Sequence, residues 1–183
     1  MRRALRIHPT GERGPVTRIE AEIRRARPAT LSLTFELTGD VAGLRLPPPA
    51  APGFMDGLWR HSCFEAFVGL AEGNYLELNL APSGRWAAYR FSGYREDMSP
   101  ASDLAAPVIQ LVRTSEGLAL KARLDLSGVA GLDPQGAWRL GLAAVIEDAQ
   151  GGLSYWALAH PAGKPDFHHC DGFVCEVRAP EDA

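Results

Sequence analysis

The sequence contains little cysteine, little lysine and no long apolar run. Its 183 residues include three cysteines, and Lys121 and Lys164 are its only lysines. So few cysteines, in an odd number, are typical of free thiols in a reducing compartment and not of a disulfide scaffold. No apolar run reaches the roughly 18–20 residues needed to span a bilayer, and none follows Arg2 and Arg3 as a signal peptide would require. We therefore expect a cytoplasmic protein that does not enter the membrane.

Excess charge of either sign is also missing. The chain has 19 basic and 22 acidic residues, a net charge of −3, which gives no general electrostatic reason to bind nucleic acid or an anionic membrane. Hydrophobic residues make up 46% and charged residues 22%, as in ordinary globular proteins. This length corresponds to one domain. We expect a single domain over residues 1–183, with its core over roughly 16–178.

The dominant pattern is alternation of apolar and polar residues with a period of two. Ile19, Ala21 and Ile23 alternate with charged residues, and the same pattern recurs over 31–37 and 118–126. Such segments are typical of half-buried antiparallel strands. Further strands are expected at 58–68, 74–80, 85–91, 107–114, 138–146, 153–160 and 172–178, with Gly- and Pro-rich turns between many of them. The sequence predicts an all-β fold with little helix, a β-sandwich of two antiparallel sheets or a barrel.

Two of the expected strands carry the residues best suited to bind a ligand. If 58–68 is one continuous strand, Trp59, His61, Cys63, Glu65 and Phe67 share a face. On the next strand Tyr75, Glu77 and Asn79 face outward, while Leu76, Leu78 and Leu80 face the core. A hairpin of these strands would gather an indole, an imidazole, two carboxyls, an amide and a phenol. Such a surface suits a sugar, because an aromatic ring stacks on C–H faces and the polar groups bind hydroxyls.

The same residues resemble a known family. Leu58-Trp59 with Glu65 six residues after the Trp, followed by the run from Tyr75 to Trp86, resembles a DOMON-like domain near the type 9 carbohydrate-binding modules. Residues 156–161 and 164–168 resemble a bacterial DOMON-like subgroup named for the cell-wall enzyme MurB. The resemblance implies a β-sandwich with a ligand on the concave face or edge of one sheet.

Within that resemblance, the positions that match sugar-contacting residues of the relatives are Trp59, Glu65, Glu77 and Asn79. The relatives carry a basic residue where this chain has Glu77. They also close the site with a second Trp near the C-terminus, where this chain offers Phe167, His168 and His169. The relatives are mostly secreted, whereas this chain has no evident signal peptide.

Several alternatives stay open on the sequence. Some DOMON relatives bind haem through Met and His, and the candidates here are His61, Met55 and Met98. The His168-His169-Cys170 run contains metal-ligating groups but lacks the paired spacing of zinc sites. Glu65 and Glu77 could form the carboxyl pair of a glycoside hydrolase. A protein-interaction module is a further alternative.

We predict a non-catalytic domain that binds a small molecule, most plausibly a sugar or sugar-derived metabolite, without a cofactor. Enzymatic activity and oligomeric state stay open. The predicted ligand-binding residues are Trp59, His61, Glu65, Tyr75, Glu77, Asn79, Phe167 and His168.

Overall fold

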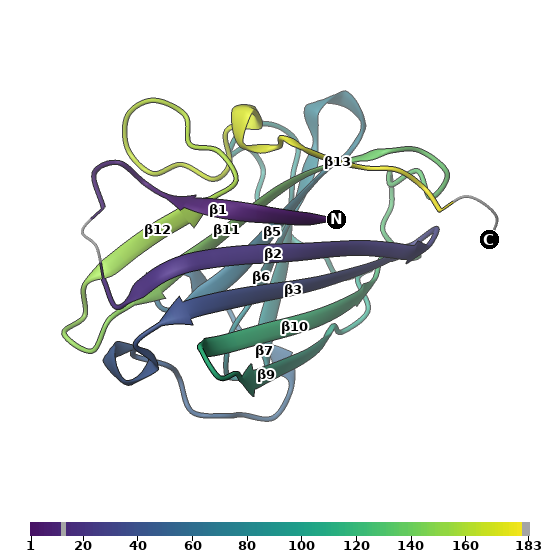
Figure 1. Cartoon of the computed structure of the whole chain (residues 1–183). Coiled ribbons are helices and arrows are strands. Elements are labelled where there is room, and N and C mark those ends of the chain that lie inside the picture. The colour runs from purple at the N-terminus through teal and green to yellow at the C-terminus, as the bar shows by residue number, and fades with distance from the viewer. Residues whose placement is uncertain (12–13, 181–183) are drawn as a thin grey trace.

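The computed structural model, which describes residues 1–11 and 14–180, is a β-sandwich whose strands are antiparallel except for the parallel pair of β4 and β7 (Figure 1). Sheet 1 contains β2 (Val16–Arg27), β3 (Thr30–Gly39), β10 (Gly117–Asp125) and β9 (Val108–Arg113). Sheet 2 contains, in spatial order, β4 (Gly53–Phe54), β7 (Arg85–Phe91), β6 (Tyr75–Leu80), β5 (Cys63–Gly69), β11 (Trp138–Glu147) and β12 (Leu153–Ala157). β8 (Ser99–Pro100) pairs with β7, and β13 (Cys175–Val177) pairs with β11. The predicted fold class is confirmed.

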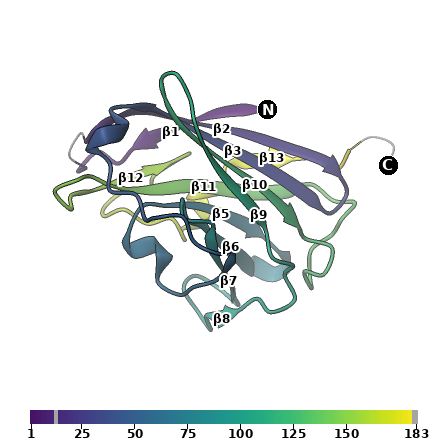
Figure 2. The same cartoon turned by 90° about the horizontal axis from the view of Figure 1, so that it is seen from below.

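β1 (Arg2–Ile7) connects the two sheets along one side of the sandwich. Its residues 2–5 pair with β2, while Arg6 and Ile7 pair with β12. Figure 1 shows β1 between these two strands, and Figure 2 shows the two layers from below. Sequence periodicity did not indicate this strand, because Leu5 is its only fully buried residue. The hydrogen bonding is therefore continuous from one sheet to the other at this side.

The main core lies between the two sheets and contains the residues that alternate inward. Phe35 of β3 packs against Phe64 of β5 with 5.1 Å between ring centroids. Leu33 and Leu120 from sheet 1 and Leu78 and Leu142 from sheet 2 belong to the same buried cluster. The outer face of sheet 1, in contrast, carries exposed ion pairs such as Arg18–Glu20. Period-two alternation in sheet 1 thus reflects one buried face and one solvated face.

The expected strand 58–68 is wrong over its first residues. Leu58–Arg60 form a 3-10 turn, η2, and β5 begins at Cys63. Gly57 has a φ of 75°, and the His61 N–H then donates to the Leu58 carbonyl at 3.2 Å, which closes the turn. The other short 3-10 turns are η1 (Val41–Gly43), η3 (Ala71–Gly73) and η4 (Cys170–Gly172). No helix in the described ranges is long and apolar enough to cross a membrane.

Candidate functional site

Unlike the strands of sheet 1, the central strands β5 and β6 of sheet 2 are buried on both of their faces. Its outer face carries a second apolar cluster that includes Phe67, Tyr75, Tyr89, Phe91 and Phe173. Because every residue from Cys63 to Val68 and from Tyr75 to Leu80 is buried, any polar side chain there is kept from bulk water. Such groups require hydrogen-bond partners or a ligand. This face is therefore where a site is expected on physical grounds.

A cavity of about 600 Å³ opens on this face, and we call it the outer-face cavity. Four aromatic residues line the cavity: Trp59, Phe91, Tyr155 and Phe167. The charged or titratable residues in its wall are Arg60, Glu65, Glu77, Arg95 and His168. Met98, Val145, Leu153 and Pro165 complete the wall. A volume of this size is in the range of small-molecule sites.

Two carboxyls form the polar part of the outer-face cavity. Glu65 of β5 is 3% exposed and Glu77 of β6 is 5% exposed. Glu65 pairs across the strands with Asn79, and Glu77 pairs with Phe67, so the two glutamates are diagonal neighbours on one face. Burial, and next the negative charge of Glu77, raise the pKa of Glu65 well above its usual range. Burial also raises the pKa of Glu77, although the hydrogen bond from Asn79 opposes that shift.

The two glutamates differ in their hydrogen bonding. Oε1 of Glu77 accepts a 2.6 Å hydrogen bond from Nδ2 of Asn79. Across residues 1–11 and 14–180, no side chain or backbone group donates a hydrogen bond to the carboxyl of Glu65. The Glu65 carboxyl therefore faces the outer-face cavity without a donor from those residues.

His168 forms part of the wall of the outer-face cavity, and a short chain of hydrogen bonds holds its ring in place. The Arg95 backbone N–H donates to the Tyr75 hydroxyl at 3.2 Å, and that hydroxyl lies 2.8 Å from Nδ1 of His168. The hydroxyl can therefore donate its own hydrogen to Nδ1, which leaves the imidazole proton on Nε2, 3.8 Å from Oε2 of Glu77. Burial, and next the charge of Arg95, lower the pKa of His168 to about 4. His168 is therefore neutral near pH 7.

Arg95 lies on the loop after β7, with a φ of 57°. Its Nη2 donates to Oδ1 of Asp166 at 2.9 Å, and the same oxygen accepts the His168 backbone N–H at 3.1 Å. Tyr94 also donates to Asp166. These contacts tie the loop after β7 to the segment that carries Phe167 and His168, and they give Arg95 a counter-ion.

Trp59 reaches the outer-face cavity from η2 and not from a strand. Its ring packs edge-on against Tyr89 of β7, with 5.8 Å between centroids and 78° between planes. The Tyr89 hydroxyl in turn donates to Asp56, just before η2. Burial and the bond to Asp56 raise the pKa of Tyr89. The indole is half-buried, so one part packs and another part faces the cavity.

The predicted residues thus separate into three groups. Trp59, Glu65, Glu77, Phe167 and His168 line the outer-face cavity together. Tyr75 and Asn79 stand behind the wall as hydrogen-bond partners of His168 and Glu77. The structure places His61 outside this cavity, contrary to the predicted strand face. Its exposed ring lies 2.8 Å from Oε2 of Glu147, which also pairs with Arg45.

Sequence reasoning missed two functional candidates, Tyr155 and Arg95. Tyr155 faces outward on β12 opposite Val145, and the alternation Leu153, Tyr155, Ala157 was available as a signal. Arg95 offered no such signal, because its loop conformation has a positive φ that the sequence does not indicate. Both residues lie on parts of the chain that sequence reasoning used only to delimit strands and loops.

A second cavity of about 680 Å³ lies beside the first and shares His168 with it. Its lining includes Leu70, Tyr94, Trp138 and Phe173. Its acidic group, Asp133, is exposed. This cavity therefore lacks the buried carboxyls of the first.

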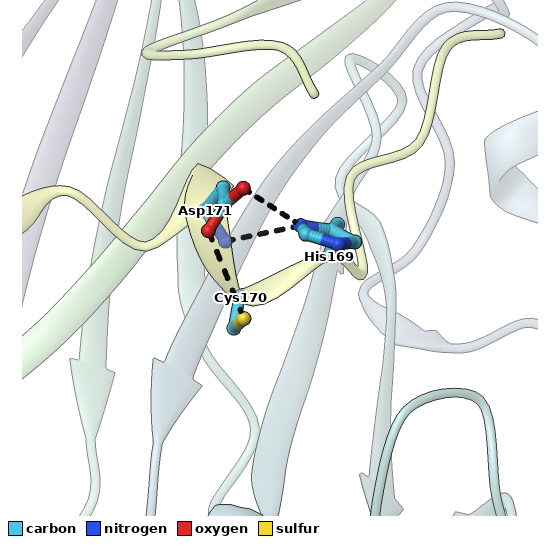
Figure 3. Close-up of side chains that lie close together, drawn as sticks. All are labelled: His169, Cys170 and Asp171. Carbon is cyan, nitrogen blue, oxygen red and sulfur yellow. Dashed lines mark hydrogen bonds and ion pairs between the residues drawn. The ribbon is translucent and has the colours of Figure 1, made fainter. Parts of the chain in front are cut away.

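His169, Cys170 and Asp171 offer three potential metal ligands within 4.8 Å of one another (Figure 3). Nδ1 of His169 accepts the Asp171 backbone N–H at 3.3 Å, which caps η4. The same nitrogen lies 3.5 Å from Oδ2 of Asp171. The arrangement is accounted for by this cap, since the three residues are consecutive and the ring nitrogen already has a donor.

No protein-family model matches the sequence, and no curated protein matches it. Solved structures do match. A protein from Bacteroides uniformis ATCC 8492, provisionally described as carbohydrate-binding, superimposes with a TM-score of 0.70 at 14% identity, covering 98% of this chain and 86% of that one. The chain has a β-sandwich fold like that of the carbohydrate-binding modules of family 9.

Two structures of such a module from Caldicellulosiruptor kristjanssonii support that statement. The complex with cellotriose gives a TM-score of 0.59 at 10% identity, covering 100% of this chain and 84% of that one. The complex with glucose gives 0.59 at 11% identity, covering 100% and 86%. At these identities the similarity establishes the fold alone.

Proposed function

We propose that this domain binds a carbohydrate in the outer-face cavity and does not cleave it. The observation that carries the proposal is the meeting of four aromatic rings and two buried carboxyls in one cavity of about 600 Å³. Aromatic faces bind the C–H faces of a sugar ring, and carboxyls bind its hydroxyls. The fold supports the proposal, because structural neighbours are described in complexes with cellotriose and glucose.

Each residue has a distinct role in this proposal. Trp59 stacks on the sugar ring, and Phe167 provides a second aromatic contact. Glu65 and Glu77 form hydrogen bonds to hydroxyls, and His168 presents its Nε2 proton. Asn79 and Tyr75 are positioning residues, since they contact Glu77 and His168 and do not line the cavity. Binding of this kind requires neither haem nor metal.

The finer family assignment is also a proposal. The residues that support membership of the DOMON-like subgroup named for MurB are Trp156–Pro161 and Lys164–His168. In the structure the first stretch begins at the end of β12, and the second leads into the cavity wall at Phe167 and His168. The resemblance therefore concerns residues near the proposed site.

Calorimetry with glucose and cellotriose tests the proposed function. We expect wild-type protein to bind at least one of them and Trp59→Ala to lose about tenfold or more in affinity, since an aromatic contact contributes about 0.5–1.5 kcal/mol beyond its buried area. Val108→Ala is the control, because Val108 is a 50% exposed apolar residue on β9 of sheet 1 that does not line the cavity. Equal losses in the two variants, or no binding by wild type, would contradict the proposal.

Glycoside hydrolysis is a second candidate, favoured by the pair of buried carboxyls. Such an enzyme needs one carboxyl as acid and the other ionised, as base or nucleophile. Here burial raises the pKa of both, and no cation within residues 1–11 and 14–180 is bonded to either carboxyl. Hydrolysis of chromogenic glycosides by wild type that disappears in Glu65→Gln would establish the enzyme and overturn the non-catalytic proposal.

A further inference from the structure

The two buried carboxyls of the outer-face cavity have no cation bonded to them in the described part of the chain. Glu65 and Glu77 are each at least nine-tenths buried, and Glu65 has no hydrogen-bond donor in the described part of the chain. The Sγ of Cys63, on the same face two residues before Glu65, donates instead to Oδ1 of Asn79, 3.6 Å away. An unbonded buried carboxyl is costly to keep, so the protein gains when a ligand supplies the donor.

The cations near the cavity do not supply that donor. Arg95 is bonded to Asp166 at 2.9 Å, so its charge already has a counter-ion, and it only partly opposes the rise in the pKa of Glu65 and Glu77. His168 is neutral near pH 7 and lies 3.8 Å from Glu77. Arg60 is exposed, and its charge is therefore screened by water and salt. The two carboxyls thus face the cavity without a buried cation between them.

A ligand ammonium group would satisfy both carboxyls better than a hydroxyl. A hydroxyl carries one donor, whereas an ammonium carries three donors and a full positive charge. Because Glu65 and Glu77 are diagonal neighbours, one small group can reach both. Trp59, Phe91, Tyr155 and Phe167 add ring faces that attract a cation.

We propose that the outer-face cavity selects an amino sugar whose protonated amine is bound between Glu65 and Glu77. This inference rests on the proposed carbohydrate binding and adds the ligand class to it. Both carboxyls become fully ionised when the ammonium binds. The protein accordingly releases protons to the buffer, and the extent depends on pH through Glu65 and Glu77. The other ionisable groups around them are Arg60, Cys63, Tyr75, Tyr89, Arg95, Tyr155, Asp166 and His168.

The test is calorimetry with methyl 2-amino-2-deoxyglucoside and methyl glucoside, which differ only in the amine. In mildly acidic buffer, where the amine is protonated, we expect the amino sugar to bind about tenfold more tightly, as charge-assisted hydrogen bonds are the stronger kind. Repeating the titration in buffers of different ionisation enthalpy should show net proton release for the amino sugar. Equal affinities without proton release would overturn the inference and leave carbohydrate binding standing.

Variants of the two glutamates test whether these residues cause the preference for the amino sugar. In Glu65→Gln and in Glu77→Gln the affinity ratio between the two sugars should fall towards one, whatever the absolute affinities. Glu116→Gln changes an exposed glutamate in the turn between β9 and β10, outside the cavity lining, and should keep the wild-type ratio. A ratio unchanged in both cavity variants would overturn the assignment.

Two further outcomes distinguish failure of the amino-sugar assignment from failure of the proposed carbohydrate binding. Cyclohexylamine supplies the ammonium without the hydroxyls, and binding as tight as that of the amino sugar would overturn the assignment to a sugar. Failure of wild type to bind either glucoside or free glucose would overturn the proposed function itself and the inference with it.

Discussion

Asn79 orients Glu77 from behind the cavity wall. The two residues lie on the same face of β6, and Nδ2 of Asn79 donates to Oε1 of Glu77 over 2.6 Å. The Cys63 thiol donates to the other end of the amide. Asn79 is completely buried and does not line the cavity, so it holds Glu77 without reaching a ligand.

Replacing that amide should therefore cost stability. In Asn79→Leu, of similar shape, Oε1 of Glu77 loses its donor while remaining buried, and we expect a loss of about 1–3 kcal/mol in the free energy of unfolding. Urea denaturation measures it. Gln110→Met is the matched control on the exposed edge strand β9 and should change stability by no more than about 0.5 kcal/mol. Similar losses in both variants would show that the Asn79–Glu77 bond is not important.

The buried Glu65 carboxyl should make stability fall as pH rises. Its pKa in the folded protein is raised above the unfolded value near 4.5, so the protonated carboxyl is favoured by folding. The resulting stability is fully present below the unfolded pKa and is lost as pH rises through the folded pKa. His168 shifts in the opposite sense and remains in both proteins when wild type is compared with Glu65→Gln.

We accordingly expect the stability of Glu65→Gln to increase relative to wild type as pH rises from about 4.5 to 8. The expected change in the free energy of unfolding is about 0.5–3 kcal/mol. Denaturation at several pH values gives this difference directly. A difference that stays constant with pH would mean that Glu65 is not buried without a partner.

His168 should titrate far below an ordinary histidine. NMR of the imidazole protons should give a pKa of about 4, because burial disfavours the imidazolium. Tyr75→Phe removes the hydroxyl that donates to Nδ1 and stabilises the neutral ring, so the pKa of His168 should rise. Tyr155→Phe lacks such a bond and should leave that pKa in place. A His168 pKa near 6.5 in wild type would contradict the burial of the ring, and an unchanged pKa in Tyr75→Phe would contradict the proposed tautomer.

The sequence was sufficient to predict the sandwich and the face shared by Glu65, Glu77 and Asn79, because strand alternation fixes both. It was insufficient for Trp59, which reaches the same cavity by way of a 3-10 turn, and for His61, which the turn directs towards Glu147. Arg95 depends on a loop held by Asp166, a contact across 71 residues. Contacts of that kind depend on the folded arrangement of loops and leave no local pattern in the chain.

The most direct test of the central claim uses the indole N–H signals of the four tryptophans in a two-dimensional NMR spectrum, assigned with Trp59→Phe. Trp59 lines the outer-face cavity, whereas Trp138 lines the second cavity and donates its own N–H to the Asp133 carbonyl at 2.8 Å. Addition of methyl 2-amino-2-deoxyglucoside or glucose should shift the Trp59 signal and leave the Trp138 signal unchanged. A shift of Trp138 alone, or no shift of Trp59 at saturating sugar, would contradict the account.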